Sequence, residues 1–468
     1  LEWIFKAVNE HGKRYHLEEG LQVAEQGLRL LQKLAGRLPE RERLEKEFDL
    51  ILEQLDLLFK GGHVQAAQEN VERLLTLAER LGVLHQAKAL HWQAFWHTCT
   101  AQYQEALRYA QEALKLSDQH TDATLKAAIL DQIGLIHFRM GDYRTALEYY
   151  QQSLEIFRTR DRLKEAHAWN DCANALVKLG EYRQALKHYE ASLKLYRELQ
   201  EQKKASAILN NIGATLRYCG EYYQALRSLE QACAIDRTTG DRLGLGFSLC
   251  NLAQTYRLLG CPQEALTLSE EAYQIFSSVE DPFGQCMMER WLGVTYRELG
   301  DYERAQDYVK RALEKAQAIE AQAEEGECLL EIAQILLDSG DHNGSLQSLQ
   351  QALQLGQRLA WSYLITRIYL VQGAVYLAQG DAQNALSTVQ AALELITQHG
   401  WGGELPIRAH YLNYRILRAL NHPDAAAALR AAQTKLLTTA QQITDNPLRE
   451  RFLSIPLHRQ ILQEAPVD

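Results

Sequence analysis

The sequence is poor in residues that interrupt helices. It contains 8 prolines among 468 residues, and none lies between Glu40 and Cys261. Proline disrupts the interior of a helix because it lacks a backbone N–H and clashes with the preceding turn, so this stretch is free to form long helices. The sequence also lacks runs of alternating apolar and polar residues, the pattern typical of half-buried strands. We therefore expect an all-α protein.

A surplus of basic residues and a long apolar segment are also missing. The chain has 50 Lys and Arg against 60 Asp and Glu, a net charge of −10, whereas binding to nucleic acid requires an excess of cations. The most apolar run, residues 368–378, is too short to cross a bilayer, and no secretory signal pattern is recognisable. These features predict a cytoplasmic protein with no nucleic-acid partner and no membrane association.

Motifs that carry chemistry are lacking as well. The 8 cysteines form no C-x-x-C pair, and no Walker loop, H-E-x-x-H or G-x-S-x-G motif occurs. The glycines at 240, 244 and 246 follow no expected strand, so we interpret them as a turn. Histidines are scattered and carboxylates lie mainly on solvated faces. The sequence therefore predicts no enzyme activity, no catalytic residues, no cofactor and no metal site.

What the sequence does contain is a repeat marked by glycine. Seven glycines recur with a first gap of 39 residues and then five gaps of 40: Gly141, Gly180, Gly220, Gly260, Gly300, Gly340 and Gly380. Helical periodicity on both sides makes each glycine the turn of a helical hairpin, because glycine adopts the left-handed conformation at a helix end without a Cβ penalty. A fixed period of this length is typical of solenoids.

Acidic and small residues hold constant positions around each turn. An acid commonly follows the glycine and is expected to cap the next helix: Asp142, Glu181, Glu221, Asp301, Asp341 and Asp381. Small residues recur seven positions before the turn and five and twelve after it, as at Gly213, Ala225 and Ala232. Such residues allow two helices to approach closely, while large apolar residues fill the space between neighbouring hairpins.

This small–large pattern resembles the tetratricopeptide repeat in its 40-residue variety, found in kinesin light chains and spindle-orientation scaffolds. The inter-repeat segments 239–242 and 279–282 are typical of that class. The resemblance implies an α-solenoid, a right-handed superhelix of about eleven stacked antiparallel hairpins. We expect degenerate hairpins over residues 1–60, with an irregular hairpin around Lys13–His16, the superhelix over 61–443, and a capping helix or tail over 444–468. The glycine-rich interruption at 399–406 is expected to open the array slightly.

In the resembled family, the first helix of each repeat lines the concave surface. The candidate partner-binding residues are those that stacking would align there. They lie ten positions before the turn (Asn170, Asn210, Arg290), nine before (Asn211, Asn251, Trp291), six before (Asn174, Gln254) and three before (Arg217, Arg257, Arg297). Amides can bind a peptide backbone, and aligned arginines favour a carboxylate or phosphate. The alternative interpretation is that these arginines are solvated cations at helix ends.

Residues 443–459 resemble the closing segment of tetratricopeptide arrays in bacterial STAND-type signal-transduction ATPases and cyclase-linked regulators. This resemblance implies a sensor or regulatory arm, with Leu1 following an effector and ATPase region. We expect a scaffold that binds a protein or peptide segment on its concave face, with an acidic or carboxylate element, in trans or from a fused domain. The alternatives are a small-molecule sensor contacted by Trp291, Asn251 and Gln254, or a structural scaffold that self-associates.

Overall fold

The computed structural model describes residues 17–34, 36–119 and 122–465, and within them every regular element is helical and no strand is present. The predictions of an all-α fold and of an α-solenoid are confirmed. Lys13–His16, the site of the expected irregular hairpin, lies outside the described residues. No helix in the described ranges is both long and apolar enough to cross a membrane. The chain divides into two compact units, Leu1–Ala175 and Leu176–Asp468, each treated by itself below.

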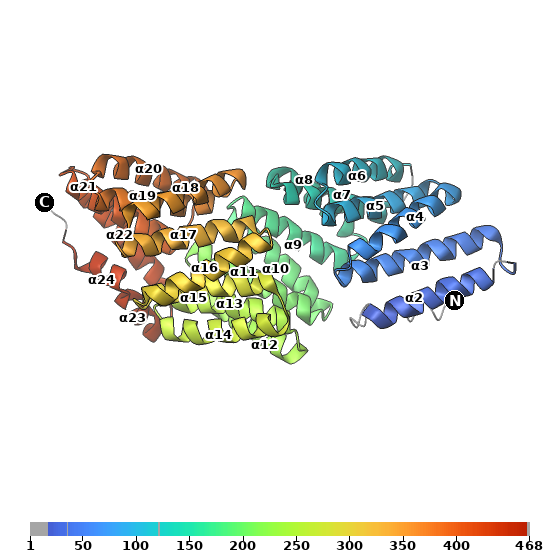
Figure 1. The fold of residues 1–468 in the computed structure, drawn as a ribbon, viewed down its shortest axis with the longest axis horizontal. Coiled ribbons are helices and arrows are strands. Elements are labelled where there is room, and N and C mark those ends of the chain that lie inside the picture. Colours follow the sequence, from blue (N-terminus) through green and yellow to red (C-terminus); the bar gives the residue numbers. More distant parts are fainter. Residues whose placement is uncertain (1–16, 35, 120–121, 466–468) are drawn as a thin grey trace. The chain divides into compact units, whose positions relative to one another are not determined.

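The first unit is a series of helices in which neighbours along the chain pack against one another (Figure 1). Its described elements are α2 (Leu17–Lys33), α3 (Glu40–Lys60), the 3₁₀ turn η1 (Gln65–Ala67), α4 (Gln68–Leu81), α5 (Val83–Cys99), α6 (Tyr103–Ser117), α7 (Ala123–Met140), α8 (Tyr143–Phe157) and α9 (Arg162–Lys178), whose last residues belong to the second unit.

The second unit continues the same arrangement through its regular hairpins to a short C-terminal segment. Its further helices are α10 (Tyr182–Glu198), α11 (Gln202–Cys219), α12 (Tyr222–Thr239), α13 (Arg242–Leu258), α14 (Pro262–Ser278), α15 (Pro282–Glu298), α16 (Tyr302–Ala318), α17 (Gln322–Asp338), α18 (His342–Arg358), α19 (Ser362–Ala378), α20 (Ala382–His399), α21 (Glu404–Ala419), α22 (Ala425–Gln441), α23 (Asn446–Ser454) and α24 (Pro456–Gln463).

The turn glycines and the small residues have the roles that the sequence predicts. All seven turn glycines have positive φ, between 78° and 87°. The small residues five and twelve positions after each turn are at most 1% exposed. A Cβ added at Gly213 would lie 2.5 Å from Leu229, and one at Gly293 would lie 2.3 Å from Val309. The two helices of a hairpin therefore approach so closely that only the smallest residues fit between them.

A second left-handed position follows each hairpin, and the sequence did not reveal it. Between one repeat and the next, φ is positive at 59°, 67°, 53°, 55°, 48° and 64° for Gln200, Gly240, Glu280, Glu320, Ala360 and Gly400 respectively. These residues are also 40 positions apart, but only two of them are glycines. The other four have a Cβ in a conformation that costs about 1–2 kcal/mol for an L-residue.

The caps divide by side-chain length. The carboxylates of Asp142, Asp301, Asp341 and Asp381 each accept a hydrogen bond from a backbone N–H in the first turn of the following helix, as predicted. The prediction is wrong for Glu221, which makes no side-chain cap and forms an ion pair with Arg183 instead. Its additional methylene places the carboxylate beyond the short reach that capping requires.

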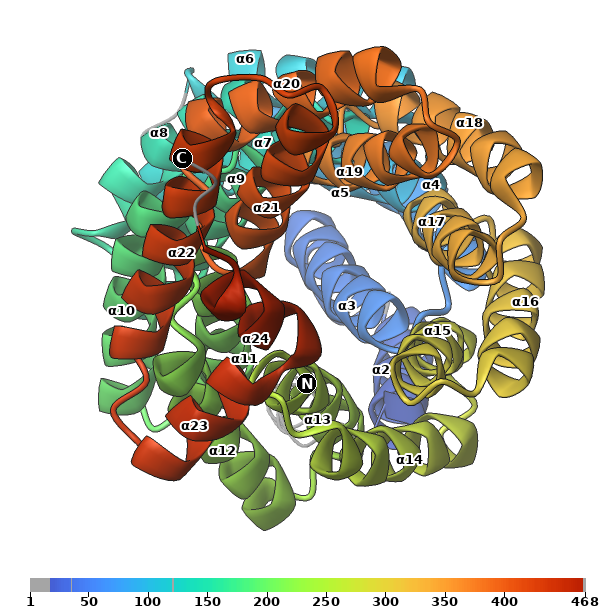
Figure 2. The ribbon, with the colours of Figure 1, turned by 90° about the vertical axis from the view of Figure 1, so that its left-hand side faces the viewer.

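Residues 399–404 bring the end of the second unit back to its beginning. The N–H of Gly402 donates to the carbonyl of Tyr218 at 2.9 Å, and the N–H of Glu404 donates to the hydroxyl of Tyr222 at 2.7 Å. Figure 2 shows α21 to α24 completing a ring with α10 to α20. The expectation that the interruption at 399–406 opens the array is wrong, because its glycines let two backbones meet: a Cβ at Gly402 would lie 2.3 Å from the Cys219 carbonyl oxygen.

The C-terminal tail extends this closure. Arg451 forms an ion pair with Glu264, and its own carbonyl lies against the turn at Gly260. The buried ring of Phe452 lies 6.0 Å from that of Tyr222. The tail therefore reaches the turns of hairpins that precede it by about two hundred residues in the sequence, as well as covering the last hairpin. We call these contacts of residues 399–404 and 451–455 with the turns at Gly220 and Gly260 the seam.

Replacing Ala360 by glycine is expected to stabilise the protein by about 0.5–1 kcal/mol, because relief of the left-handed strain exceeds the entropy that glycine adds to the unfolded chain. The matched control is Ala391→Gly, in the middle of α20, which should destabilise by about the same amount. Urea denaturation followed by circular dichroism measures both. A loss of stability in both variants would contradict the strain at residue 360.

Candidate functional site

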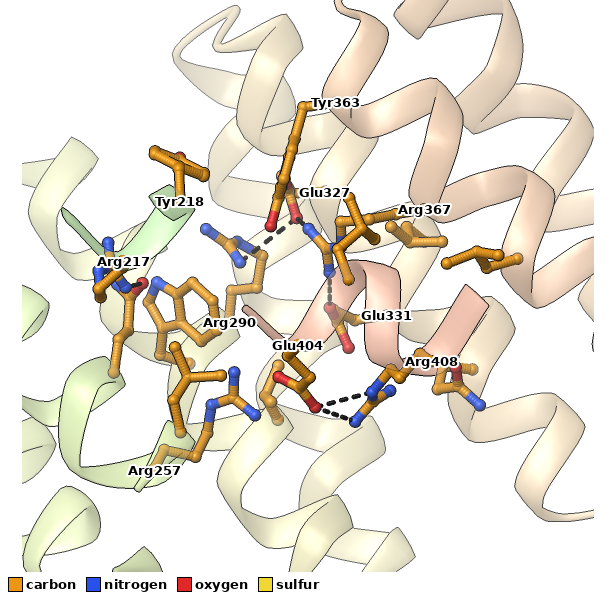
Figure 3. Close-up of a pocket in the computed structure, with 18 of the residues that line it drawn as sticks. Arg217, Tyr218, Arg257, Arg290, Glu327, Glu331, Tyr363, Arg367, Glu404 and Arg408 are labelled. Atoms are coloured by element: carbon orange, nitrogen blue, oxygen red, sulfur yellow. Dashed lines mark hydrogen bonds and ion pairs between the residues drawn. The ribbon is translucent and has the colours of Figure 1, made fainter. Parts of the chain in front are cut away.

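A cavity of about 670 Å³ lies inside the ring of the second unit, lined chiefly by the first helix of each hairpin: α11, α13, α15, α17, α19 and α21 (Figure 3). Alternate helices line it because each hairpin places its second helix outside the first. Seven of the predicted partner-binding residues are in its lining: Arg217, Asn251, Gln254, Arg257, Arg290, Trp291 and Arg297.

The remaining four candidates lie elsewhere. Asn210 is one layer behind the lining, where its Oδ1 accepts a hydrogen bond from Asn251 at 2.9 Å. Asn211 belongs to α11 but not to the lining. Asn170 and Asn174 belong to the first unit, where the Asn170 amide donates to Asp171 at 3.2 Å. The aligned group that we expected to act together is therefore divided between the two units.

The lining carries more positive than negative charge. It contains eight cationic side chains (Lys178, Arg217, Arg257, Arg290, Arg297, Arg367, Arg408 and Arg415) and four anionic ones (Glu324, Glu327, Glu331 and Glu404). The cavity thus reverses the sign of the whole chain, whose net charge is −10. Such an enclosed excess of one sign attracts ligands of the opposite sign, since low-dielectric walls focus the field.

Most of these arginines are paired with a carboxylate of the next repeat. Arg257 donates to Glu298 at 2.5 Å and Arg297 donates to Asp338 at 3.0 Å, and both partners lie 41 positions later in the sequence. Arg290 donates to Glu324 at 2.9 Å, 34 positions later. The interpretation of these arginines as free solvated cations therefore does not describe them. They join one hairpin to its neighbour.

Arg217 is the exception, because both of its hydrogen bonds end on neutral amides. Its guanidinium donates to Asn251 Oδ1 at 2.9 Å and to Gln254 Oε1. The position 41 residues later, occupied by Glu298 and Asp338 in the following repeats, is Leu258 here. Burial lowers the pKa of Arg217 from its ordinary value. A buried charge without a countercharge is costly, so this is the place in the cavity where an anion would be bound most favourably.

Several guanidinium donors in the cavity are also unsatisfied. The Nε of Arg217, Arg257 and Arg297 and the Nη1 of Arg290 are buried and have no hydrogen-bond partner among the described residues. Each such group costs about 1–3 kcal/mol. The arginines of the lining therefore retain capacity to donate after all of their protein contacts have been made.

The sequence analysis missed the acidic half of the site. Arg367 donates to Glu327 at 2.5 Å and to Glu331 at 2.6 Å, so that one arginine joins two buried carboxylates. The signal was available in the register: Glu331 lies nine positions before its turn, as Asn251 and Trp291 do, and the residues thirteen before the turns also line the cavity (Phe247, Met287, Glu327, Arg367). Following each position through all the repeats would have found them.

Glu404 lies at the junction of the cavity and the seam. Its carboxylate pairs with Arg408, with Nε donating at 2.7 Å, and Figure 3 shows it between Arg408 and Arg257. Burial alone would raise the pKa of Glu404, but Arg408 and Arg257 outweigh burial and lower it to about 2. Glu404 therefore stays ionised at neutral pH and neutralises part of the arginine excess.

Aromatic rings complete the lining. The indole of Trp291 lies 4.4 Å from the Arg290 guanidinium and 5.7 Å from that of Arg257. Tyr218 stacks on Tyr182 at 4.9 Å and meets Tyr363 edge-on at 5.0 Å. No group of three or more His, Cys, Asp or Glu side chains in the described part of the chain is arranged to hold a metal ion. The site offers guanidinium, amide and aromatic contacts, which suit binding.

Models of the tetratricopeptide repeat match residues 125–198, 204–278, 285–358 and 330–399, more than half of the chain. The chain belongs to the tetratricopeptide repeat family. A 55-residue part of it is 46% identical to the Photosystem I assembly protein Ycf3 of Rippkaea orientalis, a match that covers 12% of this chain and 30% of that relative. The chain thus matches less than a third of the length of that curated relative.

Two solved structures have the same fold over most of this tetratricopeptide chain. The apo form of RapI has a TM-score of 0.60 at 14% identity, covering 77% of this chain and 98% of that one. The Rap conjugation gene regulator of the plasmid pLS20, in complex with the Phr* peptide, has a TM-score of 0.50 at 13% identity, covering 76% and 95%. The similarity is one of fold, and it identifies the chain as a repeat scaffold.

Glu331→Gln is expected to destabilise the protein by about 3 kcal/mol, because it leaves Arg367 and Arg297 with uncompensated charge in a buried site. The control is Glu230→Gln, which breaks a surface ion pair with Arg227 and should cost less than about 1 kcal/mol. Urea denaturation of both variants at neutral pH measures the difference. Equal losses would show that the buried network adds no more than a surface pair does.

The contribution of Glu404 should depend on pH. Its pKa is lowered in the folded state from 4.5 to about 2, so the unfolded state binds the proton more readily between these values. The stability that ionised Glu404 supplies is therefore complete above about pH 4.5 and is lost as the pH falls through about 2. We expect the difference in free energy of unfolding between the parent and Glu404→Gln to be largest near pH 6 and to shrink towards pH 2. A constant difference would contradict this assignment.

Proposed function

We propose that this tetratricopeptide scaffold binds an acidic segment of a peptide or protein partner in the cavity of the second unit. The observation that carries the proposal is Arg217, a buried guanidinium whose hydrogen bonds end only on amides within a cavity that has an excess of positive charge. A carboxylate of the partner would supply the missing countercharge through charge-assisted hydrogen bonds.

The surroundings of Arg217 suit a peptide. Asn251 and Gln254 provide amides that can donate to and accept from a main chain of any sequence, and Trp291 and Tyr363 provide apolar faces for side chains. The Rap conjugation gene regulator, which has a similar fold, binds the Phr* peptide. A volume of about 670 Å³ accommodates a short segment and excludes a folded domain.

We further propose that the chain acts as the sensor or regulatory arm of a bacterial signal-transduction protein, with its partner in trans or in a fused domain. The resemblance of residues 443–459 to the closing segment of STAND-type arrays supports this role, and so does their place in the structure. Arg451 and Phe452 belong to the seam that closes the ring, so the segment lies where a change in the array would be felt first.

A small-molecule sensor is the second candidate, because the volume of the cavity falls within the range of small-ligand pockets. An acidic metabolite or sugar acid would use the same arginines, with Trp291 as a stacking surface. Thermal stabilisation of the parent chain by members of a metabolite library, at concentrations where acidic peptides have no effect, would favour this function. A self-associating structural scaffold would instead show concentration-dependent sedimentation that no ligand changes.

Selection of random heptapeptides on the immobilised full chain tests the proposal. We expect enriched peptides to carry Asp, Glu or a required free carboxyl terminus, and Arg217→Gln to bind them 10-fold to 100-fold more weakly, the equivalent of a lost charge-assisted hydrogen bond of about 1.5–3 kcal/mol. Arg237→Gln is the matched control, since Arg237 forms an exposed pair with Glu271 and does not line the cavity.

Circular dichroism first establishes that the variants are equally helical. Peptides without acidic enrichment, or equal affinity of the parent and Arg217→Gln, would count against binding at the arginines. Equal weakening by Arg217→Gln and Arg237→Gln would assign the effect to the overall charge of the chain.

A further inference from the structure

The seam that closes the ring is built differently from the contacts between hairpins. Elsewhere in the second unit, neighbouring hairpins pack along the length of their helices. At the seam, contacts are confined to turns and helix ends: the glycines at 402 and 403 against the turn at Gly220, and Arg451 against the turn at Gly260. A connection of this kind has little apolar area for its position, so it is the part of the ring that can separate at least cost.

Few polar contacts hold the seam. Gly402 donates its N–H to the Tyr218 carbonyl at 2.9 Å, Glu404 donates its N–H to the Tyr222 hydroxyl at 2.7 Å, and Arg451 pairs with Glu264 at the surface. A net contribution of about 1 kcal/mol for each hydrogen bond is typical. The closed state therefore depends on contacts that single substitutions can remove without disturbing the repeats.

Glu404 connects the seam to the cavity within one residue. Its backbone N–H is part of the seam, while its carboxylate lines the cavity and is held by Arg408 and Arg257 (Figure 3). Arg257 also donates to Glu298. In the closed ring, the negative charge that faces Arg257 from across the seam is thus supplied by the protein itself.

We propose that the ring opens and closes at the seam, and that an acidic ligand controls this by replacing the Glu404 carboxylate at Arg257. The inference rests on the proposed function, since the ligand is the acidic segment proposed above. A ligand shifts an equilibrium only by its difference in affinity for the two states. When the seam is open, Glu404 no longer competes for Arg257, so an anion binds the open state more tightly.

Opening would also provide an output. Phe452 is 0% and Tyr222 1% exposed in the closed ring, and the two rings meet across the seam. Separation would uncover both side chains at the C-terminal end of the array. Binding in the cavity would thereby change a surface that another domain or protein can contact.

Hydrogen exchange of the full chain, read by mass spectrometry, tests the gate without a ligand. Tyr222→Phe removes the hydroxyl that accepts from Glu404 and retains the ring. We expect about five-fold faster exchange in a peptide covering residues 446–455, which that hydroxyl does not bond, equivalent to about 1 kcal/mol at 1.4 kcal/mol per tenfold. Tyr302→Phe is the matched control, because Tyr302 has the same place after its turn and is exposed. Exchange unchanged by Tyr222→Phe, or changed equally by both variants, would overturn the gate.

Succinate tests the link to the cavity. We expect 50 mM succinate, compared with sodium chloride at equal ionic strength, to speed exchange of residues 399–404 and 446–455 at least two-fold in the parent and not in Arg257→Gln. An equal response in both variants, or none in the parent, would overturn control by the arginine. A seam that responds to Tyr222→Phe while peptide selection fails leaves the gate standing and removes the proposed function, and the converse result separates them equally clearly.

Discussion

The left-handed turn at glycine sets the register on which the second unit depends. Because it returns every 40 residues, each position of the repeat returns to the same place on its hairpin, and stacking converts that position into a row along the inner surface. The close approach at Gly213 and Gly293 fixes the separation of the two helices. The cavity is the sum of a few such rows, so its chemistry is determined by which residue each repeat places in them.

The rows also explain how charge is distributed inside the ring. An arginine three positions before one turn reaches a partner in the next repeat, and Arg257 and Arg297 find carboxylates there. Arg217 has the same register but meets amides, since Leu258 replaces the acid. A single departure from the repeat thus leaves one buried guanidinium without a countercharge. Binding of an anion and cohesion between repeats use the same kind of residue, separated only by what the neighbouring hairpin provides.

Closure of the ring adds a constraint that a simple stack of hairpins does not have. An open solenoid can change its curvature gradually, whereas a closed one must either keep its radius or separate at its weakest contact. Here that contact consists of backbone against backbone at glycines, with Glu404 reaching from it into the arginine face. The site and the element that moves therefore share a residue, as a sensor requires.

The helices, the turns and the inner rows could be predicted from the sequence, because the repeat makes local patterns recur at fixed intervals and local sterics decide glycine turns and small packing positions. Even the missed Glu327 and Glu331 follow the same register. The left-handed residues without glycine, such as Ala360, were invisible because tertiary packing imposes their conformation against propensity. The tertiary structure alone decided that the Arg217 guanidinium meets amides and that Gly402 touches the turn at Gly220, since both depend on how the angles between successive hairpins accumulate around a ring.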